Sequence, residues 1–184
     1  MAKCLICESR KGKRKCVISD GLICSQCCGS TRTEALCLGC VWYQKPTRRY
    51  NEVPTYSVSD METNLELESY GNCIEGALCA YDVENQGALT DSDAIRVIEL
   101  LIDKYHFQDE QLDQEPQVAV GGFQFVDKCI MEDLEGVDRE KIVKVLGVIQ
   151  FVAKRRTRIG REYLNIVHQY VGQRVGSGIR VLRQ

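Results

Sequence analysis

The distribution of apolar and polar residues divides this chain into a helical part and a part without helical periodicity. In the helical part, apolar residues recur three or four positions apart, the spacing of one face of an α-helix. No helix is apolar all round, so each needs neighbours, and the pattern predicts a bundle of about four or five helices. The stripes are Ile95, Ile98, Leu101, Ile102 and Tyr105; Phe123, Val126, Ile130 and Leu134; Ile142, Val145, Leu146, Ile149 and Val152; and Leu164, Val167 and Val171.

Capping residues predict where several of these helices begin and end. Ser59-x-x-Glu62 has the form of a capping box and predicts a helix over residues 60–84. Thr90 to Asp93 can cap a helix over 91–106, and Asp138 can open the helix that ends in the basic run from Lys154. Gly160 separates that helix from the last one. The final apolar residues, Ile179 to Leu182, fit either a strand or a helical turn.

The segment over residues 46–58 differs from both of its neighbours. It contains Pro46 and Pro54, is largely polar, and has no helical period, which is typical of a linker. The sequence therefore predicts a mainly α protein with a small module over 1–45, this linker, and an α-helical domain over 59–184.

The module is distinguished by its cysteines, because eight of the chain's eleven precede residue 41. The start, Met1 to Cys4, lacks the apolar segment of a signal peptide, and no stretch approaches the roughly 18 apolar residues of a membrane span. We therefore expect a cytoplasmic protein without membrane contact. Clustered cysteines in a reducing compartment more often bind metal than form disulfides.

The cysteine spacing predicts zinc. Two residues between two thiolates allow both to reach one ion at ~2.3 Å on a tight turn, and three Cys-x2-Cys pairs occur here. The module has few large apolar residues and would need a bound metal ion in order to fold. The alternating order of the pairs favours two interleaved sites: Cys4, Cys7, Cys24 and Cys27 on one ion, and Cys16, Cys28, Cys37 and Cys40 on the other.

The run Cys16-Val-Ile-Ser-Asp20-Gly-Leu-Ile-Cys24-Ser-Gln-Cys27 resembles the middle of the B-box, HIT-type and MYND-type cross-brace zinc fingers. The resemblance covers residues 4–40 and implies a treble-clef-like module that serves protein–protein contact or assembly and seldom catalysis. It departs from the B-box because Cys37 and Cys40 replace the final histidine pair, and because three residues rather than two separate Asp20 from Cys16. Either Cys28 or Asp20 can complete the second site, and a module with a single zinc is the alternative.

These observations favour an adaptor or scaffold that contacts a protein partner or a second copy of itself. Coordination by four cysteines leaves no open position for water or substrate, so the zinc is expected to be structural. Charge is unevenly distributed: residues 1–50 carry ten Lys/Arg and three Asp/Glu, residues 51–153 carry six and twenty-two, and residues 154–184 carry eight and one. A basic head and tail thus flank an acidic middle, and these regions can attract each other or separate partners.

A nucleic-acid-binding regulator is the second hypothesis. Lys11, Lys13, Arg14 and Lys15 form a basic loop, Arg32, Lys45, Arg48 and Arg49 extend the charge, and Trp42, Tyr43 and Tyr50 lie among them. Phosphates would be attracted to such a surface and bases could stack on the rings. A solvated loop that offsets the negative charge of zinc–thiolate sites has the same composition. Lys154 to Arg161 can likewise bind phosphate or an acidic partner, or end a helix, and we favour the latter.

An enzyme with a site in the helical domain is the third and weakest hypothesis. The only histidines, His106 and His168, have no spacing that indicates a metal or acid–base pair, and Glu162 lies six residues before His168. Cys73, Cys79 and Cys129 fall in predicted helices, where a free cysteine behaves as a small apolar residue. Gly121 and Gly122 match no phosphate-binding pattern. The sequence indicates no catalytic residue and no small-molecule substrate.

Overall fold

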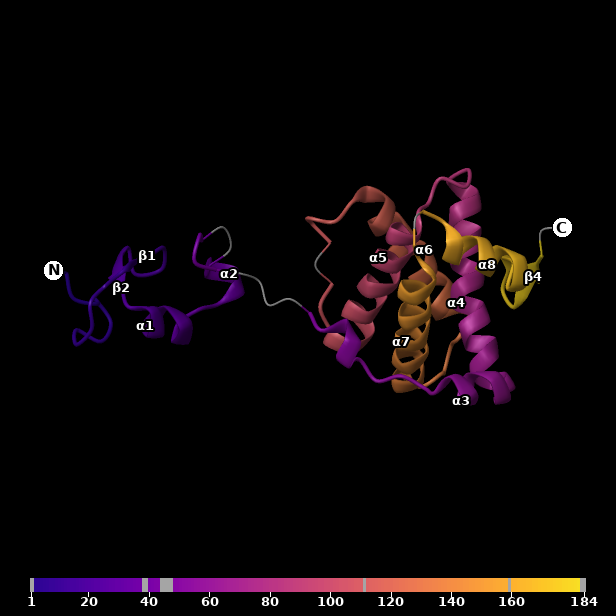
Figure 1. Cartoon of the computed structure of the whole chain (residues 1–184), viewed down its shortest axis with the longest axis horizontal. Coiled ribbons are helices and arrows are strands. Elements are labelled where there is room, and N and C mark those ends of the chain that lie inside the picture. The colour runs from indigo at the N-terminus through magenta and orange to yellow at the C-terminus, as the bar shows by residue number, and fades with distance from the viewer. Residues whose placement is uncertain (1, 38–39, 44–47, 111, 159, 183–184) are drawn as a thin grey trace. The chain divides into compact units, whose positions relative to one another are not determined.

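The structure is a computed structural model that describes residues 2–37, 40–43, 48–110, 112–158 and 160–182, without the side chains of Glu34 and Ala35. The chain forms two compact units, Met1–Arg48 and Arg49–Gln184 (Figure 1). The division falls inside the predicted linker. Lys45 and residues 46–47 of that linker lie outside the described ranges.

The first unit is built from short elements around cysteines. An isolated bridge pairs Lys3 with Lys11, and a two-stranded antiparallel sheet follows, with β1 (Arg14–Cys16) beside β2 (Gly21–Ile23). Two short helices complete the unit, α1 (Ser25–Ser30) and α2 (Glu34–Cys37). Its buried cluster consists of Cys4, Ile23, Cys24 and Cys27. Three cysteines and one isoleucine are too little apolar material to hold a domain together, as the sequence predicts.

The second unit is mainly helical, as predicted, but its described residues form six α-helices instead of the four or five expected, in part because the helix expected over 60–84 is divided in two. A short 3₁₀ turn, η1 (Tyr50–Glu52), precedes a set of helices and a terminal hairpin. The elements are α3 (Val58–Thr63), α4 (Leu65–Glu84), α5 (Asp91–Ile102) with its π-helical continuation η2 (Asp103–Phe107), α6 (Gln117–Asp133), α7 (Arg139–Arg156), α8 (Glu162–Tyr170), β3 (Gln173–Gly176) and β4 (Ile179–Val181).

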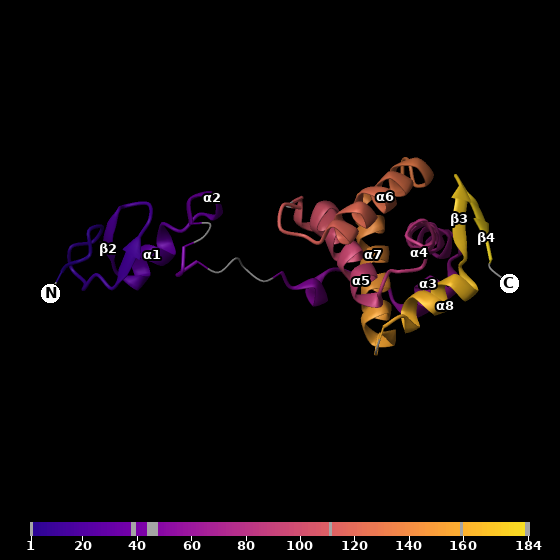
Figure 2. The ribbon, with the colours of Figure 1, turned by 90° about the horizontal axis from the view of Figure 1, so that it is seen from above.

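The helices enclose one core. Helix α5 packs against both α6 and α7, and α4 packs against α6, α7 and α8. The apolar stripes of the sequence point inward, with Ile98, Leu101, Val126, Leu146 and Leu164 at no more than 1% exposure. The antiparallel hairpin of β3 and β4 lies beside α4 (Figure 2). Of the residues Ile179 to Leu182, all but Leu182 therefore form a strand, which is one of the two predicted alternatives.

The helix predicted over residues 60–84 is two helices, and the prediction of its cap is wrong. The capping box consists of Ser57 and Asp60, and Ser59 lies inside α3. The chain then breaks at Asn64, whose side-chain oxygen accepts from the backbone N–H groups of Glu66 and Leu67 and so starts α4. Asparagine competes for backbone hydrogen bonds, which is why it ends one helix and caps the next.

The capping box at Thr90 and Asp93 is confirmed, and Asp138 caps α7 as predicted. The segment after Arg49, predicted to be linker, packs against the helical unit. Val53 is 5% exposed and belongs to the core. Close approach is possible because Gly147 has no side chain: a Cβ there would lie 2.8 Å from the carbonyl oxygen of Pro54.

Candidate functional site

Cys4 and Cys7 lie on a tight loop that closes on itself. The backbone N–H of Cys4 donates to the carbonyl of Arg10 at 2.7 Å, and that of Glu8 donates to the carbonyl of Cys4 at 2.9 Å. Glu8 adopts a left-handed conformation with φ of 51°, which turns the chain directly after Cys7. The loop thereby directs two thiols toward the same point.

Cys24 and Cys27 supply a second pair from the start of α1. Cys24 is the N-cap residue, and its sulfur accepts from the backbone N–H of Cys27 at 3.4 Å. The sulfurs of Cys7 and Cys24 are 3.9 Å apart, and all four sulfurs lie within 4.8 Å of one another. Four thiols from a loop and a helix start, converging this closely, can hold one metal ion.

Hydrogen bonds around the cluster favour thiolates at two positions. The pKa of Cys7 is lowered to about 5, first by the side chain of Ser9 and then by the backbone N–H groups of Arg10 and Ser9. The pKa of Cys24 is lowered by the backbone N–H of Cys27. The pKa of Cys27 is raised to about 12, because its thiol is hydrogen-bonded to Cys24 and is buried. A divalent cation would bring all four to the thiolate form.

The other four predicted ligands behave differently. Within the described ranges, Cys16, Cys28, Cys37 and Cys40 form no comparable group. The sulfur of Cys28 instead lies 3.5 Å from Nη1 of Arg14 and 3.7 Å from Nη2 of Arg32. The first of these hydrogen bonds is the main cause of a lowered pKa at Cys28. Asp20, the alternative ligand, occupies a left-handed position with φ of 44° in the turn between β1 and β2.

All eleven cysteines are in the described ranges, and all are free thiols. The pKa of Cys73 is raised to about 12, first by burial, and that of Cys129 is raised for the same reason. Such thiols are poor nucleophiles. His168 contacts Asp82 at 2.8 Å, and His106 packs edge-on against Phe107. These residues belong to the packing of the helical unit.

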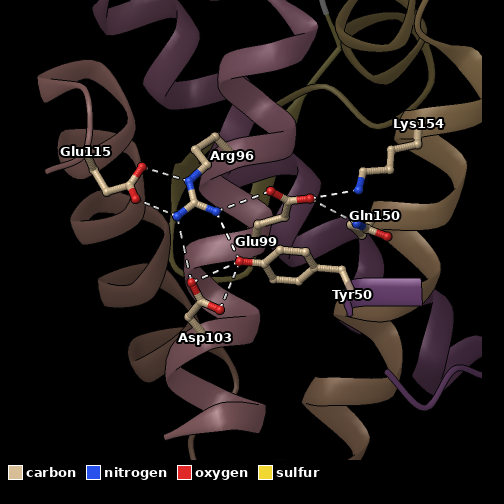
Figure 3. A network of polar contacts seen from close by, with 7 residues as sticks. All are labelled: Tyr50, Arg96, Glu99, Asp103, Glu115, Gln150 and Lys154. Atoms are coloured by element: carbon tan, nitrogen blue, oxygen red, sulfur yellow. Dashed lines mark hydrogen bonds and ion pairs between the residues drawn. The ribbon is translucent and has the colours of Figure 1, made fainter. Parts of the chain in front are cut away.

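A polar network that the sequence does not predict connects the segment after Arg49 to the helices (Figure 3). Arg96 on α5 is its centre and forms a bidentate pair with Glu115, with distances of 2.6 and 2.8 Å. The hydroxyl of Tyr50 donates to Asp103 at 3.0 Å and accepts from Arg96 at 3.1 Å. Burial raises the pKa of Tyr50 to about 12, so this hydroxyl stays protonated.

On the other side of Arg96, Glu99 joins the network to α7. It accepts from Lys154 at 2.8 Å and from Gln150 at 3.2 Å, and Arg96 lies 3.3 Å away. Arg96 and Glu99 are an i,i+3 pair, but Tyr50, Glu115, Gln150 and Lys154 come from distant parts of the sequence, so no local pattern could have identified the whole network.

Two adjoining cavities flank α7. One, of about 650 Å³, lies between residues 50–58 and α7. The other, of about 440 Å³, lies among α3, α4 and α7 and includes Glu75. Val58 and Val148 line both.

No family model matches the chain, and comparison with curated proteins and with solved structures also gives no match. Of the helices in the described ranges, none is long and apolar enough to cross a lipid bilayer. The function has to be argued from the site itself.

Proposed function

We propose that this chain is an adaptor or scaffold protein whose N-terminal unit is folded by structural zinc and binds a protein partner. The observation that carries the proposal is the convergence of Cys4, Cys7, Cys24 and Cys27 within 4.8 Å. Four thiolates favour zinc among the common divalent ions and fill its tetrahedral shell. A filled shell has no position for a reacting water, so the ion stabilises the fold and performs no chemistry.

A second ion remains part of the proposal. Cys16, Cys37 and Cys40, with Cys28 or Asp20, would hold it. Cys28 would then exchange its contacts with Arg14 and Arg32 for the metal. Arg14 also lies 5.1 Å from the ring centroid of Trp42, a contact that would remain and that occupies one basic and one aromatic side chain of the unit. That arrangement supports the adaptor over the nucleic-acid-binding regulator.

The surface of the first unit supports a protein partner. Large apolar side chains are exposed on the cysteine loop and on the hairpin: Leu5 60%, Ile6 45%, Val17 70%, Ile18 43% and Leu22 39%. The backbone N–H of Leu5 donates to the carbonyl of Leu22 at 3.1 Å, so the loop and the hairpin are neighbours. An exposed apolar surface on a small unit is typical of a protein-binding site. A reducing, cytoplasmic compartment would keep the thiols available for the ion.

The test separates the metal from the surface. Partners cross-linked to the full chain in cells are compared for wild type, Cys4→Ser, and the double variant Val17→Ser/Ile18→Ser. The matched control is Val175→Ser on the hairpin of the helical unit, where Val175 is 55% exposed.

The proposal predicts a defined partner that is lost with Cys4→Ser and with the double variant and is kept with Val175→Ser. A partner that survives both changes in the first unit would contradict it. Recovery of RNA or DNA instead, with affinity that falls steeply as salt rises, would establish the regulator.

A further inference from the structure

The cavity between residues 50–58 and α7 has walls of two kinds. Three aromatic rings line it, those of Tyr50 and Tyr56 from the segment and that of Phe151 from α7. Two basic residues from the last turn of α7, Lys154 and Arg155, also line this cavity. Its volume of about 650 Å³ is within the range of pockets that hold small molecules in proteins.

The wall formed by Tyr50 and its segment is fixed before any ligand arrives. The hydroxyl of Tyr50 is held by Asp103 and Arg96 (Figure 3), which restricts the position of its ring. Val53 is anchored in the core, and the bare Gly147 lets the segment approach α7. A preformed wall costs less conformational entropy on binding than one that must be ordered.

The cations at the cavity are available to an anion. Arg155 forms no ion pair with any residue that the structure describes, and its guanidinium lies 5.5 Å from the ring centroid of Phe151. The neighbouring Arg156 is exposed and also has no ion pair within the described ranges. Lys154 is paired with Glu99, but Glu99 keeps Arg96 and Gln150 if Lys154 turns away. Lys154 can therefore move to a ligand without leaving a carboxylate unpartnered.

Hydrogen-bonding groups complete the site. The exposed side chains of Asn51 and Thr55 lie on the segment, and the amide of Gln150 lies on α7. Aromatic faces suit a planar ring, amides and hydroxyls suit its polar edge, and a lysine beside an arginine suits a phosphate. A nucleoside phosphate combines these three features in one molecule.

We infer that this cavity binds a nucleoside phosphate, with the base against Tyr50, Tyr56 and Phe151 and the phosphate on Lys154 and Arg155. The ligand is either a free mononucleotide or one nucleotide of a single strand. This inference is independent of the zinc unit and of its protein partner, since every residue that it uses lies in the second unit.

The test is calorimetric titration of the full-length protein with AMP, adenosine and an eight-nucleotide oligoadenylate. Phe151→Ala removes one of the aromatic rings that line the cavity, at a side chain that is 49% exposed. Arg155→Gln removes one of the cations. The matched controls lie outside the cavity: Tyr170→Ala on α8, 71% exposed, and Lys128→Gln on α6, 76% exposed.

We expect AMP to bind more tightly than adenosine, and Arg155→Gln to reduce that difference, since Lys154 remains. Phe151→Ala should weaken AMP at least about fivefold, the lower end of what one base–aromatic stack contributes. Tighter binding of the oligomer than of AMP, weakened by the same two variants, supports the site and identifies the strand as the source. Absence of binding by both AMP and the oligomer, or equal binding by the cavity variants and the controls, overturns the inference.

Discussion

The carboxylate of Asp82 on α4 lies 2.7 Å from Nη2 of Arg161, which directly precedes α8. Asp82 is 1% exposed, and the same oxygen contacts His168 at 2.8 Å. Arg161 also donates to the backbone carbonyl of Leu89. The residues of the basic run from Lys154 to Arg161 therefore differ in role. Arg161 links α8 to α4 through its ion pair, whereas Arg155 and Arg156 are exposed on the surface.

Replacement of Arg161 by alanine should destabilise the helical unit. The change leaves the carboxylate of Asp82 buried without its main cation, and breaking one partner of a buried pair costs about 3 kcal/mol or more. Urea unfolding of the full chain, followed by far-UV circular dichroism, measures the loss. Arg156→Ala is the control, since an exposed surface change is expected to stay within about 0.5 kcal/mol. Equal stability of the two variants would contradict the structural role of Arg161.

Glu75 predicts a dependence of stability on pH. Burial raises the pKa of Glu75 to about 7, against an ordinary value of 4.5, although the hydroxyl of Tyr163 donates to it at 2.8 Å and Arg180 lies nearby. Between these two values the folded state holds a proton that the unfolded chain releases. This group's contribution to stability is therefore present at low pH and is lost as pH rises from about 4.5 to about 7.

Glu75→Gln removes this contribution while keeping an acceptor for Tyr163. The difference in unfolding free energy between Glu75→Gln and wild type should grow in favour of the variant across this pH window and then level off. Glu68 is an exposed glutamate that lines the same cavity among α3, α4 and α7 as Glu75 does. The control Glu68→Gln should leave the pH profile of stability unchanged. Parallel pH profiles for wild type and Glu75→Gln would show that Glu75 titrates normally.

Gly147→Ala tests the packing of residues 49–58 on α7. The added Cβ would lie 2.8 Å from both the carbonyl oxygen of Pro54 and Cγ2 of Thr55, and overpacking of this kind costs about 1–3 kcal/mol. We expect faster hydrogen exchange in residues 49–57. Gly71→Ala is the matched control, because its Cβ would meet only Met61 at 3.5 Å, and alanine is the better helix former by roughly 0.5–1 kcal/mol. Unchanged exchange in Gly147→Ala would mean that this segment is a free linker.

The sequence predicts the features that rest on local spacing. The helical stripes, the Thr90 cap and the group of Cys4, Cys7, Cys24 and Cys27 follow from residues a few positions apart or from paired motifs. Ser59 and Glu62 have the spacing of a capping box, as Ser57 and Asp60 do, and the structure starts α3 at Ser57 and ends it at Asn64. Similar patterns with different tertiary surroundings account for that error.

Features that depend on distant residues could not be predicted in this way. Tyr50 and Arg96 are 46 positions apart, and Asp82 and Arg161 are 79 apart. Polar residues in a proline-containing segment are typical of a linker, and the packing of Val53 becomes evident only when α7 is in place. The contacts of Cys28 were missed for a different reason: Arg32 is only four residues away, but neither Arg14 nor Arg32 shares a metal-binding pattern with Cys28.

Native mass spectrometry of the full chain, purified without chelator, tests the central claim most directly. Wild type should carry at least one zinc ion, Cys4→Ser and Cys24→Ser should lose one ion each, and Cys73→Ser, in the helical unit, should retain the wild-type count. A second ion in wild type that Cys37→Ser removes would establish the second site. Wild-type protein without metal, or a zinc count that Cys4→Ser and Cys24→Ser leave unchanged, would contradict the account.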